Sequence, residues 1–348
     1  MTQYHVGIDL HKSVAQVCVR DDEGEIVEEK RFRVPDAVEG QELISWLARY
    51  RDQGRCAVEA IGCNRWFVNS ARAQGLDVLV VNPSKLGLKT EGKKTDRRDA
   101  RKIARLLRLG DLDRFAKTYF PTDEEYGERK VLRVRHALLK ERVRTVCQIR
   151  GMLNAYLLRP PTTELYEARC LGWLKKQELP TEDLTCVLQT LTQSLESVTQ
   201  AIKKLDSRIR ARKKDAEISQ MMEQLPSVGP QTAMTLRAEL GDVQRFRHAR
   251  AAAAYGGLVP RVSASADRSH HGRLTRRGSP ELRWILTEWA VRLLRGDPLV
   301  KRWAEPMLRR MHKNKVRMAL ARRLLVSVWV MLTRGETFSM RLCLGVPA

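Results

Sequence analysis

Two carboxylates stand three residues apart in a strongly basic stretch, residues 93–102, which holds six lysines and arginines. Asp96 and Asp99 lie in the run Lys-Thr-Asp-Arg-Arg-Asp-Ala of residues 94–100. This spacing projects both side chains from one face of a helix. Paired carboxylates can hold a divalent cation, and the surrounding positive charge suits a polyanion. A single pair of this kind is, however, more often a solvated helix face with local ion pairs.

Two further acids end short apolar segments. Asp9 follows Val-Gly-Ile of residues 6–8, and Glu59 follows Cys-Ala-Val of residues 56–58. Each stands where a short buried strand presents its last side chain. Two acids at strand ends and a helical pair match the way that ribonuclease-H-like folds hold two Mg²⁺ ions about 4 Å apart for in-line attack on a phosphodiester. The sequence therefore predicts a magnesium site formed by four acids: Asp9, Glu59, Asp96 and Asp99.

The pattern of residues 1–122 is that of an α/β domain, and its elements must position these acids. The expected strands are residues 4–9, 15–20, 26–34, 55–59 and 76–81. The expected helices are residues 41–50, 65–74 and 99–109. Three strands, a helix, and then strand-helix-strand-helix is the element order of a ribonuclease-H-like domain.

Residues 123–215 have the pattern of a helical connector. Its second half carries apolar residues at alternating steps of four and three, which is typical of a coiled-coil seam. These residues are Leu184, Leu188, Leu191, Leu195, Val198, Ile202, Leu205 and Ile209. The seam fits a coiled coil between subunits or a hairpin within the chain with a helix over residues 124–158, and both can hold together. Pro160-Pro161 separates the two helical stretches.

Residues 216–348 are predicted to be mainly helical. Residues 225–233 resemble the turn of a helix-hairpin-helix motif, whose backbone N–H groups contact a phosphate, although an ordinary helix connection fits equally. A polar segment, residues 260–278, follows. Residues 283–334 hold 13 lysines and arginines against 3 acids. The four tryptophans of that stretch have apolar neighbours, so we expect most of them in a core and not stacked on bases.

The composition favours a nucleic-acid partner. The 348 residues suffice for two or three domains, and 64 basic against 41 acidic residues give a formal charge of +23. No apolar run approaches the roughly 20 residues that span a membrane, and no signal peptide is recognisable. The seven cysteines contain no C-x-x-C pair, which argues against a zinc knuckle or a disulfide framework. We therefore expect a cytoplasmic protein without a membrane partner.

The order and spacing of several motifs resemble one known family over nearly the whole chain. The chain is similar to the insertion-sequence transposases with an N-terminal DEDD domain, relatives of the Piv DNA invertase. The matching pieces are Gly-Ile-Asp-Leu-His-Lys (7–12), Val-Glu-Ala (58–60), Val-Asn-Pro (81–83), residues 94–100, Leu-Pro-Ser-Val-Gly (225–229), Tyr-Gly-Gly-Leu-Val-Pro (255–260), Gly-Arg-Leu-Thr-Arg-Arg-Gly (272–278) and Leu-Arg (282–283).

The resemblance implies a RuvC-like first domain, a coiled-coil connector and a C-terminal transposase domain. It assigns the family's four metal-binding acids to the four acids named above. It also implies an essential serine in a serine-glycine pair shortly after the G-L-x-P element. Counting back from Gly278 gives Ser265, where Ala266 replaces the usual glycine, so that Ser263 and Ser269 stay open.

The resemblance further implies a transposase that cleaves and exchanges DNA strands through a phosphoserine intermediate. Its active site would be composite, with Ser265 of one subunit meeting the acids of another in a dimer or tetramer. A non-coding bridge RNA would pair with donor and target DNA in a bacterial or archaeal nucleoid. One alternative is a RuvC-like nuclease that uses water as the nucleophile. A second is a basic nucleic-acid-binding protein whose acids have lost their function.

Overall fold

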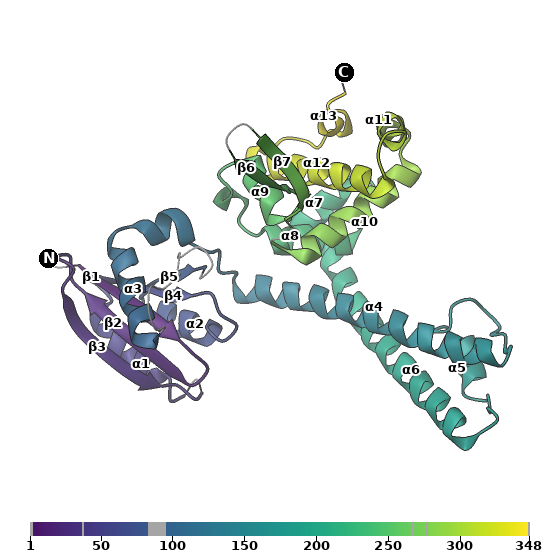
Figure 1. The fold of residues 1–348 in the computed structure, drawn as a ribbon, viewed down its shortest axis with the longest axis horizontal. Coiled ribbons are helices and arrows are strands. Elements are labelled where there is room, and N and C mark those ends of the chain that lie inside the picture. Colours follow the sequence, from purple (N-terminus) through teal and green to yellow (C-terminus); the bar gives the residue numbers. More distant parts are fainter. Residues whose placement is uncertain (1–2, 37, 83–94, 266–267, 276–277, 347–348) are drawn as a thin grey trace. The chain divides into compact units, whose positions relative to one another are not determined.

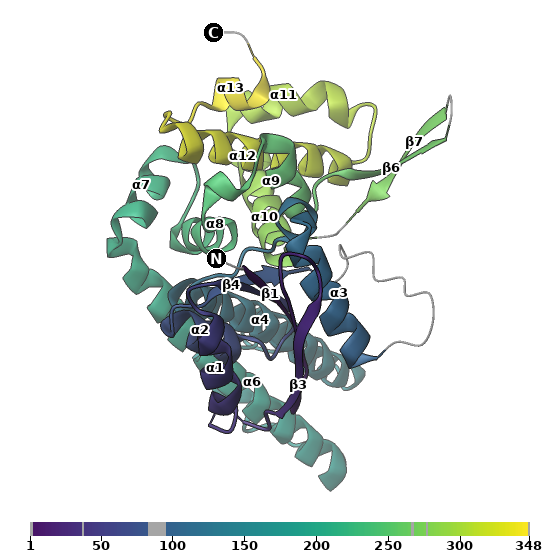
Figure 2. The ribbon, with the colours of Figure 1, turned by 90° about the vertical axis from the view of Figure 1, so that its left-hand side faces the viewer.

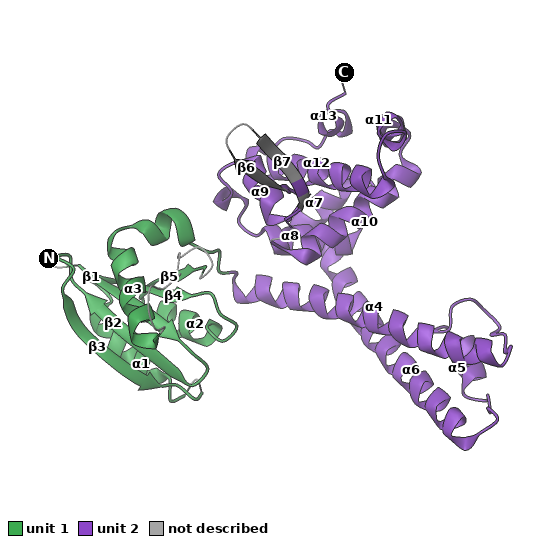
Figure 3. Ribbon diagram, viewed as in Figure 1, with its two compact units in different colours: residues 1–120 green, residues 121–348 purple. Residues whose placement is uncertain are grey.

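The computed structural model describes residues 3–36, 38–82, 95–265, 268–275 and 278–346. Outside these residues lie four positions of the matching motifs, Pro83, Lys94 and residues 276–277, and Ala266, which follows the predicted serine. The chain forms two compact units, residues 1–120 and 121–348 (Figure 1, Figure 3). The first is mixed α/β and the second mainly helical, which confirms the predicted fold class at that level. The division of the second unit at residue 215 stays a prediction.

The first unit is built on a five-stranded mixed sheet with the order β3-β2-β1-β4-β5. The central strand, β1, is antiparallel to β2 and parallel to β4, and β4 is parallel to β5. Every strand agrees with the sequence prediction to within one residue at each end. The bounds are β1 Tyr4–Leu10, β2 Val14–Arg20, β3 Ile26–Arg33, β4 Gly54–Glu59 and β5 Asp77–Val81.

Helices cover both faces of this sheet, as Figure 2 shows for α1 and α2 on one side and α3 on the other. Their bounds are α1 Gln41–Leu47, the 3₁₀ turn η1 Ala48–Tyr50, α2 Arg65–Ala73, α3 Asp96–Arg108 and the π-helical turn η3 Leu112–Ala116. Alternate residues of β1 serve the two faces. Val6, Ile8 and Leu10 pack with α1 and α2, while the residues between them face α3. The helix α3 begins at Asp96, three residues before the predicted start.

An arm of two long helices opens the second unit (Figure 1). The helix α4 covers Asp123–Ala155, the short α5 Ala168–Leu174 and α6 Glu182–Ala211. A capping box between Thr122 and Glu125 starts α4. Because α4 and α6 pack on each other, the structure shows the helical hairpin within the chain.

The heptad row of α6 divides into two rows that differ in burial. Leu188, Leu195, Ile202 and Ile209 are buried. The four members that alternate with them are only partly buried: Leu184, Leu191, Val198 and Leu205. Buried Thr192 and Thr199 complete the inner row. The single seam expected from the sequence is therefore a buried inner seam of the hairpin and a half-exposed row, of which Leu184 and Leu191 still pack against the hairpin core.

The rest of the second unit is a helical body that also carries one β-hairpin. Its elements are η4 Arg212–Lys214, α7 Ala216–Gln224, α8 Pro230–Leu240, η5 Val243–Arg245, α9 Ala249–Tyr255, β6 Pro260–Ser265, β7 Arg268–Leu274, α10 Pro280–Gly296, α11 Pro298–Leu308, α12 Lys313–Arg334 and α13 Met340–Leu344. Trp289 is fully buried, and Trp284, Trp303 and Trp329 pack against the same core. The expectation of core tryptophans is thus confirmed. The hairpin was not predicted, because its strands are short and polar.

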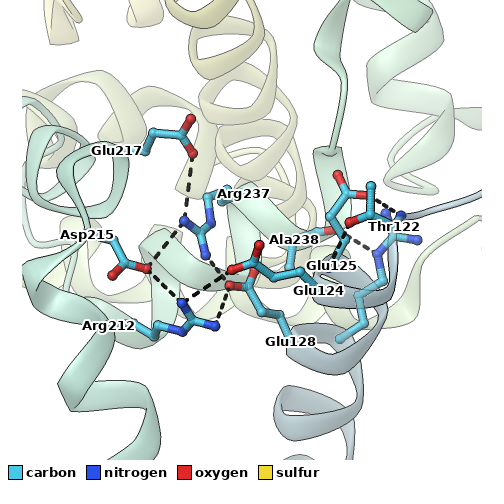
Figure 4. A network of polar contacts seen from close by, with 10 residues as sticks. Thr122, Glu124, Glu125, Glu128, Arg212, Asp215, Glu217, Arg237 and Ala238 are labelled. Carbon is cyan, nitrogen blue, oxygen red and sulfur yellow. Dashed lines mark hydrogen bonds and ion pairs between the residues drawn. The ribbon is translucent and has the colours of Figure 1, made fainter.

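Ion pairs fasten the arm to the body (Figure 4). Glu128 of α4 is only 4 % exposed and binds Arg237 of α8 and Arg212 of η4. Burial raises the pKa of Glu128, and the two guanidinium groups oppose that shift. Arg129, the next residue, donates through Nε to the Ala238 carbonyl at 2.6 Å. A buried charge is stable only with such partners, so the first turns of α4 are fixed to the body.

Among the described residues, no helix is both long enough and apolar enough to cross a membrane.

Candidate active site

Asp9 lies near the end of the central strand, on the sheet face that α3 covers. Its neighbours Ile8 and Leu10 point into the core beneath α1 and α2, so Asp9 points to the opposite face. The side chain of Asp9 is 10 % exposed. A carboxylate this deeply placed in a strand needs a cation or hydrogen-bond donors to remain charged.

Close packing brings the start of α3 over β1. A Cβ added to Gly7 would lie 2.2 Å from the Ala100 carbonyl oxygen and 2.3 Å from the Ala104 nitrogen. The helix backbone therefore rests directly on the strand, where only glycine fits. The Oγ1 atom of Thr95 accepts the N–H of Arg98 at 3.4 Å and caps the helix. These contacts set Asp96 and Asp99, in the first turn, beside Asp9.

A histidine joins two of the predicted acids. His11 Nε2 is 3.3 Å from Asp9 Oδ2 and 3.4 Å from Asp96 Oδ1. One ligand atom from each of these three residues lies within 4.8 Å of the others. The side chains of His11 and Asp96 are about half exposed, at 54 % and 48 %. The group therefore has one buried and two accessible members, which leaves room for a substrate oxygen.

The electrostatics of this group favour a bound cation. Burial raises the pKa of Asp9, His11 opposes the shift, and the nearby carboxylates of Asp96 and Asp99 raise it further. Asp99 is itself buried, at 4 % exposure. A buried carboxylate whose charge is opposed by burial and by neighbouring carboxylates is stabilised by a divalent ion. Carboxylate oxygens and an imidazole nitrogen are ligands that suit a divalent metal, so the donor set fits such an ion.

Glu59 occupies the expected strand end, one strand from Asp9. It is the last residue of β4, and the register that pairs Ile8 with Val58 places it level with Asp9. Ala57, two residues earlier, packs on the α3 side, so Glu59 belongs to the same face. Neither its carboxylate nor that of Asp99 belongs to the three-residue group, and Asp99 is close enough to Asp9 to raise the pKa of Asp9. The structure therefore brings Asp9, Asp96 and Asp99 together and sets Glu59 at the edge of the site.

Two of the cations in the basic stretch serve the fold. Arg97 Nε and Arg101 Nε donate to the carboxylate of Glu29 on β3 at 2.8 and 2.6 Å. The hydrogen bonds from Arg101 and Arg97 lower the pKa of Glu29 to about 2, against the effect of burial. These guanidinium groups hold α3 on the sheet, so they are less available to a polyanion than their number suggested.

Ser265 is the last residue of β6 and belongs to the second unit, whereas the acids belong to the first. Its backbone pairs with Arg268, and the pairs Ser263–His270 and Ala264–Ser269 precede it in the hairpin. All three candidate serines therefore lie near the tip of the β6–β7 hairpin, on both of its strands. The neighbouring Ala266 and Asp267 lie outside the described residues.

The expected helix-hairpin-helix turn joins α7 to α8. Trp289 Nε1 donates to the Pro226 carbonyl at 2.8 Å, and Arg292 Nε donates to the Ser227 carbonyl at 3.3 Å. Ser227 has a positive φ of 58°. The turn is thus anchored to α10, and a role in phosphate binding stays a prediction.

Sequence reasoning missed two contributors to the site, His11 and Gly7. His11 stands two residues after Asp9, and residues at this spacing share a strand face, which was an available signal. The sequence shows Gly7 as part of an apolar segment and of the motif of residues 7–12, without a role of its own. Its role depends on how closely α3 approaches, and nothing in the sequence reveals that distance.

The first unit is α/β and gathers acids where its central strand meets α3, and the second unit is helical. These are the features of a DEDD-type protein, and family comparisons agree. A model of DEDD-domain transposases matches residues 6–158, and one described as the transposase IS116/IS110/IS902 family matches residues 219–304. The chain belongs to this family of insertion-sequence transposases. The family resemblance predicted from the sequence is thereby confirmed.

Curated relatives align over almost the full chain. The transposase for insertion sequence element IS1111A of Coxiella burnetii is 28 % identical over 340 residues, which are 96 % of this chain and 90 % of the relative. A probable family 20 transposase of Pseudomonas aeruginosa is 27 % identical over 97 % of this chain and 99 % of its own length. The transposase for element IS1328 of Yersinia enterocolitica is 26 % identical over 96 % and 98 %.

Proposed function

We propose that this protein cleaves and exchanges DNA strands as the transposase of a mobile element, through a phosphoserine intermediate. The observation that carries the proposal is the convergence of Asp9, Asp96 and Asp99 where β1 meets α3, inside the region that matches the DEDD domain. The family relationship supports DNA as the substrate. The strand order and the placement of the acids support a RuvC-like, ribonuclease-H-type fold for the first unit.

The acids have distinct tasks in this scheme. Asp9 and Asp96 are the metal ligands supported by the geometry, with Asp99 as a buried neighbour and Glu59 at the strand end beside them. Mg²⁺, which we expect as two ions, supplies Lewis acidity toward the attacked phosphodiester when bound. His11 contacts both Asp9 and Asp96 and thereby orients their carboxylates.

Ser265 is the proposed nucleophile. Its Oγ forms a bond to phosphorus and the bond from phosphorus to one nucleotide oxygen breaks. The hydroxyl proton of the serine is lost and the leaving oxygen takes up one proton, so that a nucleotide hydroxyl is released. The energy of the phosphodiester is kept in the phosphoserine, so a second hydroxyl can attack and rejoin a strand without a nucleotide cofactor. Because the serine and the acids are in different units, the same scheme can use partners from two subunits.

The half-exposed row of α6 supports such a subunit contact. Leu184 and Leu191 of this row pack against the hairpin core, and Val187, Ser194, Val198, Ala201 and Leu205 lie on the same side of the helix. Val187 is 49 % exposed, and the small Ser194 and Ala201 permit close approach of another helix. We therefore propose pairing of arms between two copies, with composite active sites. The variant Val198→Glu/Leu205→Glu should shift the sedimentation coefficient toward the monomer, and an unchanged assembly would contradict the pairing.

Guidance by RNA is the second part of the proposal. A non-coding bridge RNA that pairs with donor and target DNA would supply sequence specificity, and the charge of +23 suits an assembly with both nucleic acids. Sequencing of RNA that copurifies with the protein tests this point. A discrete transcript with loops complementary to the ends of the element is expected, whereas random cellular RNA would contradict guidance.

Trapping of a covalent adduct tests the serine chemistry. Wild-type protein, Mg²⁺ and DNA carrying the element ends should yield a protein–DNA adduct that resists denaturant, and Ser265→Ala should abolish it. Ser263→Ala and Ser269→Ala are matched controls from the same hairpin, and they should retain the adduct. Cleavage without any adduct, unaffected by Ser265→Ala, would instead support the RuvC-like nuclease that uses water.

A mixing experiment tests the composite site. Asp9→Asn and Ser265→Ala proteins should each be inactive alone, and their mixture should regain part of the adduct, because one copy supplies the acids and the other the serine. Equal inactivity of the mixture, with both proteins folded and assembled, would contradict sharing between subunits.

A further inference from the structure

A basic hollow of about 690 Å³ lies between α10, α11 and α12, helices that pack on one another in the second unit. Its apolar lining comes from Val291, Leu294, Ala304 and Leu308. Six cations line it as well: Arg295, Lys301, Arg302, Arg309, Lys313 and Arg317. None of these residues belongs to the catalytic scheme above. We name this feature the α11 groove.

The charge of the α11 groove is unbalanced. Its lining contains one carboxylate, that of Glu305, which binds Arg309 at 2.7 Å. Except for the half-buried Arg317, the lining cations are exposed. So many cations around one hollow repel one another and attract a polyanion, with release of counterions as a driving force.

The apolar lining distinguishes between kinds of polyanion. Ala304 is fully buried, whereas Leu308 is 48 % exposed and presents an apolar side chain among the cations of the lining. A duplex presents phosphates and keeps its bases stacked inside, so it exposes no base face that could contact an apolar side chain. A single strand presents phosphates together with the apolar faces of unstacked bases.

We propose that the α11 groove binds a single-stranded segment of nucleic acid, with phosphates on the exposed cations and a base against Leu308 and Leu294. This inference rests on the proposed function, in that it gives a nucleic-acid enzyme a second contact away from its catalytic acids. The groove has the size of a site for a small ligand, which suits one or two nucleotides.

Binding of a fluorescent 12-nucleotide oligouridine to the full-length protein in EDTA tests the cations. The variant Lys301→Gln/Lys313→Gln removes two charges from the groove. The control Arg310→Gln/Lys315→Gln removes two charges from exposed positions beside it that do not line it. The groove variant should reduce the slope of log affinity against log salt by about 1.4, the value for two phosphate contacts on a single strand. Equal slopes for variant and control would overturn the proposal.

The apolar lining is tested with Leu308→Gln. This change should weaken oligouridine binding about tenfold, as expected for the loss of one base contact, and leave the salt slope and the binding of a 12-bp duplex unchanged. The control is Leu342→Gln on α13, where Leu342 is 77 % exposed and lies outside the groove. Equal weakening of duplex and single strand would contradict the base contact. If a polyglutamate peptide binds the groove and oligouridine does not, the proposal is overturned and the groove is assigned to acidic protein.

The two proposals fail separately. If the wild type forms the serine adduct while the groove variants behave like their controls, the groove inference alone is wrong. If no adduct forms but the groove variants lose single-strand binding, the catalytic proposal is wrong and the groove stands. Melting curves of all variants establish that each is folded.

Discussion

Replacement of Gly7 by alanine should disrupt the acidic site without touching any of its ligands. The new Cβ would lie 2.2 Å from the Ala100 oxygen and 2.3 Å from the Ala104 nitrogen, and both atoms belong to the α3 backbone. Ordinary contact begins near 3.4 Å, so the helix must withdraw from β1 by about 1 Å. A helix backbone does not yield as a flexible side chain does, so α3 moves as a body.

This displacement separates the ligands, because Asp9 is on β1 and Asp96 is on α3. Metal-ligand distances tolerate deviations of only about 0.2 Å, and a misplacement of about 1 Å at a catalytic site can cost about 10²-fold in rate. We therefore expect a loss of adduct formation of about 10²-fold. Overpacking should also lower the free energy of unfolding by about 1–3 kcal/mol.

The assay is Mn²⁺ binding followed by electron paramagnetic resonance, with adduct yield and urea unfolding measured on the same preparations. Gly62→Ala is the control, since a Cβ at Gly62 meets no atom within 4 Å and its φ is not positive. It should match the wild type in all three measurements. A Gly7→Ala protein that binds Mn²⁺ and forms adduct as the wild type does would refute the packing argument.

Three further perturbations have defined outcomes. Gly127→Ala in α4, where a Cβ meets nothing within 4 Å, should raise the free energy of unfolding by about 0.5–1 kcal/mol in urea, and a decrease would contradict the helix assignment. Glu128→Ala leaves Arg237 and Arg212 without their shared carboxylate and should lower the free energy of unfolding by about 3 kcal/mol, while a neutral result would show that the arm is not fixed by these pairs. Because the folded-state pKa of Glu29 is lowered to about 2 from 4.5, its stabilisation should be complete above pH 4.5 and vanish as the pH falls toward about 2. The difference in thermal midpoint between wild type and Glu29→Gln should follow that course, and a difference independent of pH would exclude the ion pair as its source.

The sheet could be predicted closely because its strands carry strong local signals. Residues 6–8 and 56–58 are apolar runs that are each followed by an acid, and the turn near Gly24 separates two alternating segments. The positions of Asp9 and Glu59 followed directly from those strand ends. The start of α3 was placed late because Asp96 and Arg97 are polar, and the capping signal of Thr95 was not used.

Other features depend on tertiary contacts that no short pattern contains. The 4-3 row of α6 reads as one seam, but Leu188 and its heptad equivalents are buried together with Thr192 and Thr199, while the alternate members are only partly buried. The inner face of α6 includes polar threonines, so the pattern of apolar residues does not show which face of the helix is buried. His11 belongs to the site because α3 brings Asp96 close to it. The ion pair between Arg97 and Glu29 depends on the pairing of β3 with β2.

The central claim is that carboxylates of β1 and α3 together form a divalent-metal site. Titration of the full-length protein with Mn²⁺ tests it most directly, with Asp9→Asn and Asp96→Asn against Asp52→Asn, an exposed acid elsewhere in the first unit. Each site variant should lose Mn²⁺ affinity at least tenfold, while Asp52→Asn keeps the wild-type value, since removal of a ligand costs about 1.4 kcal/mol or more. Wild-type affinity in both site variants would contradict the account.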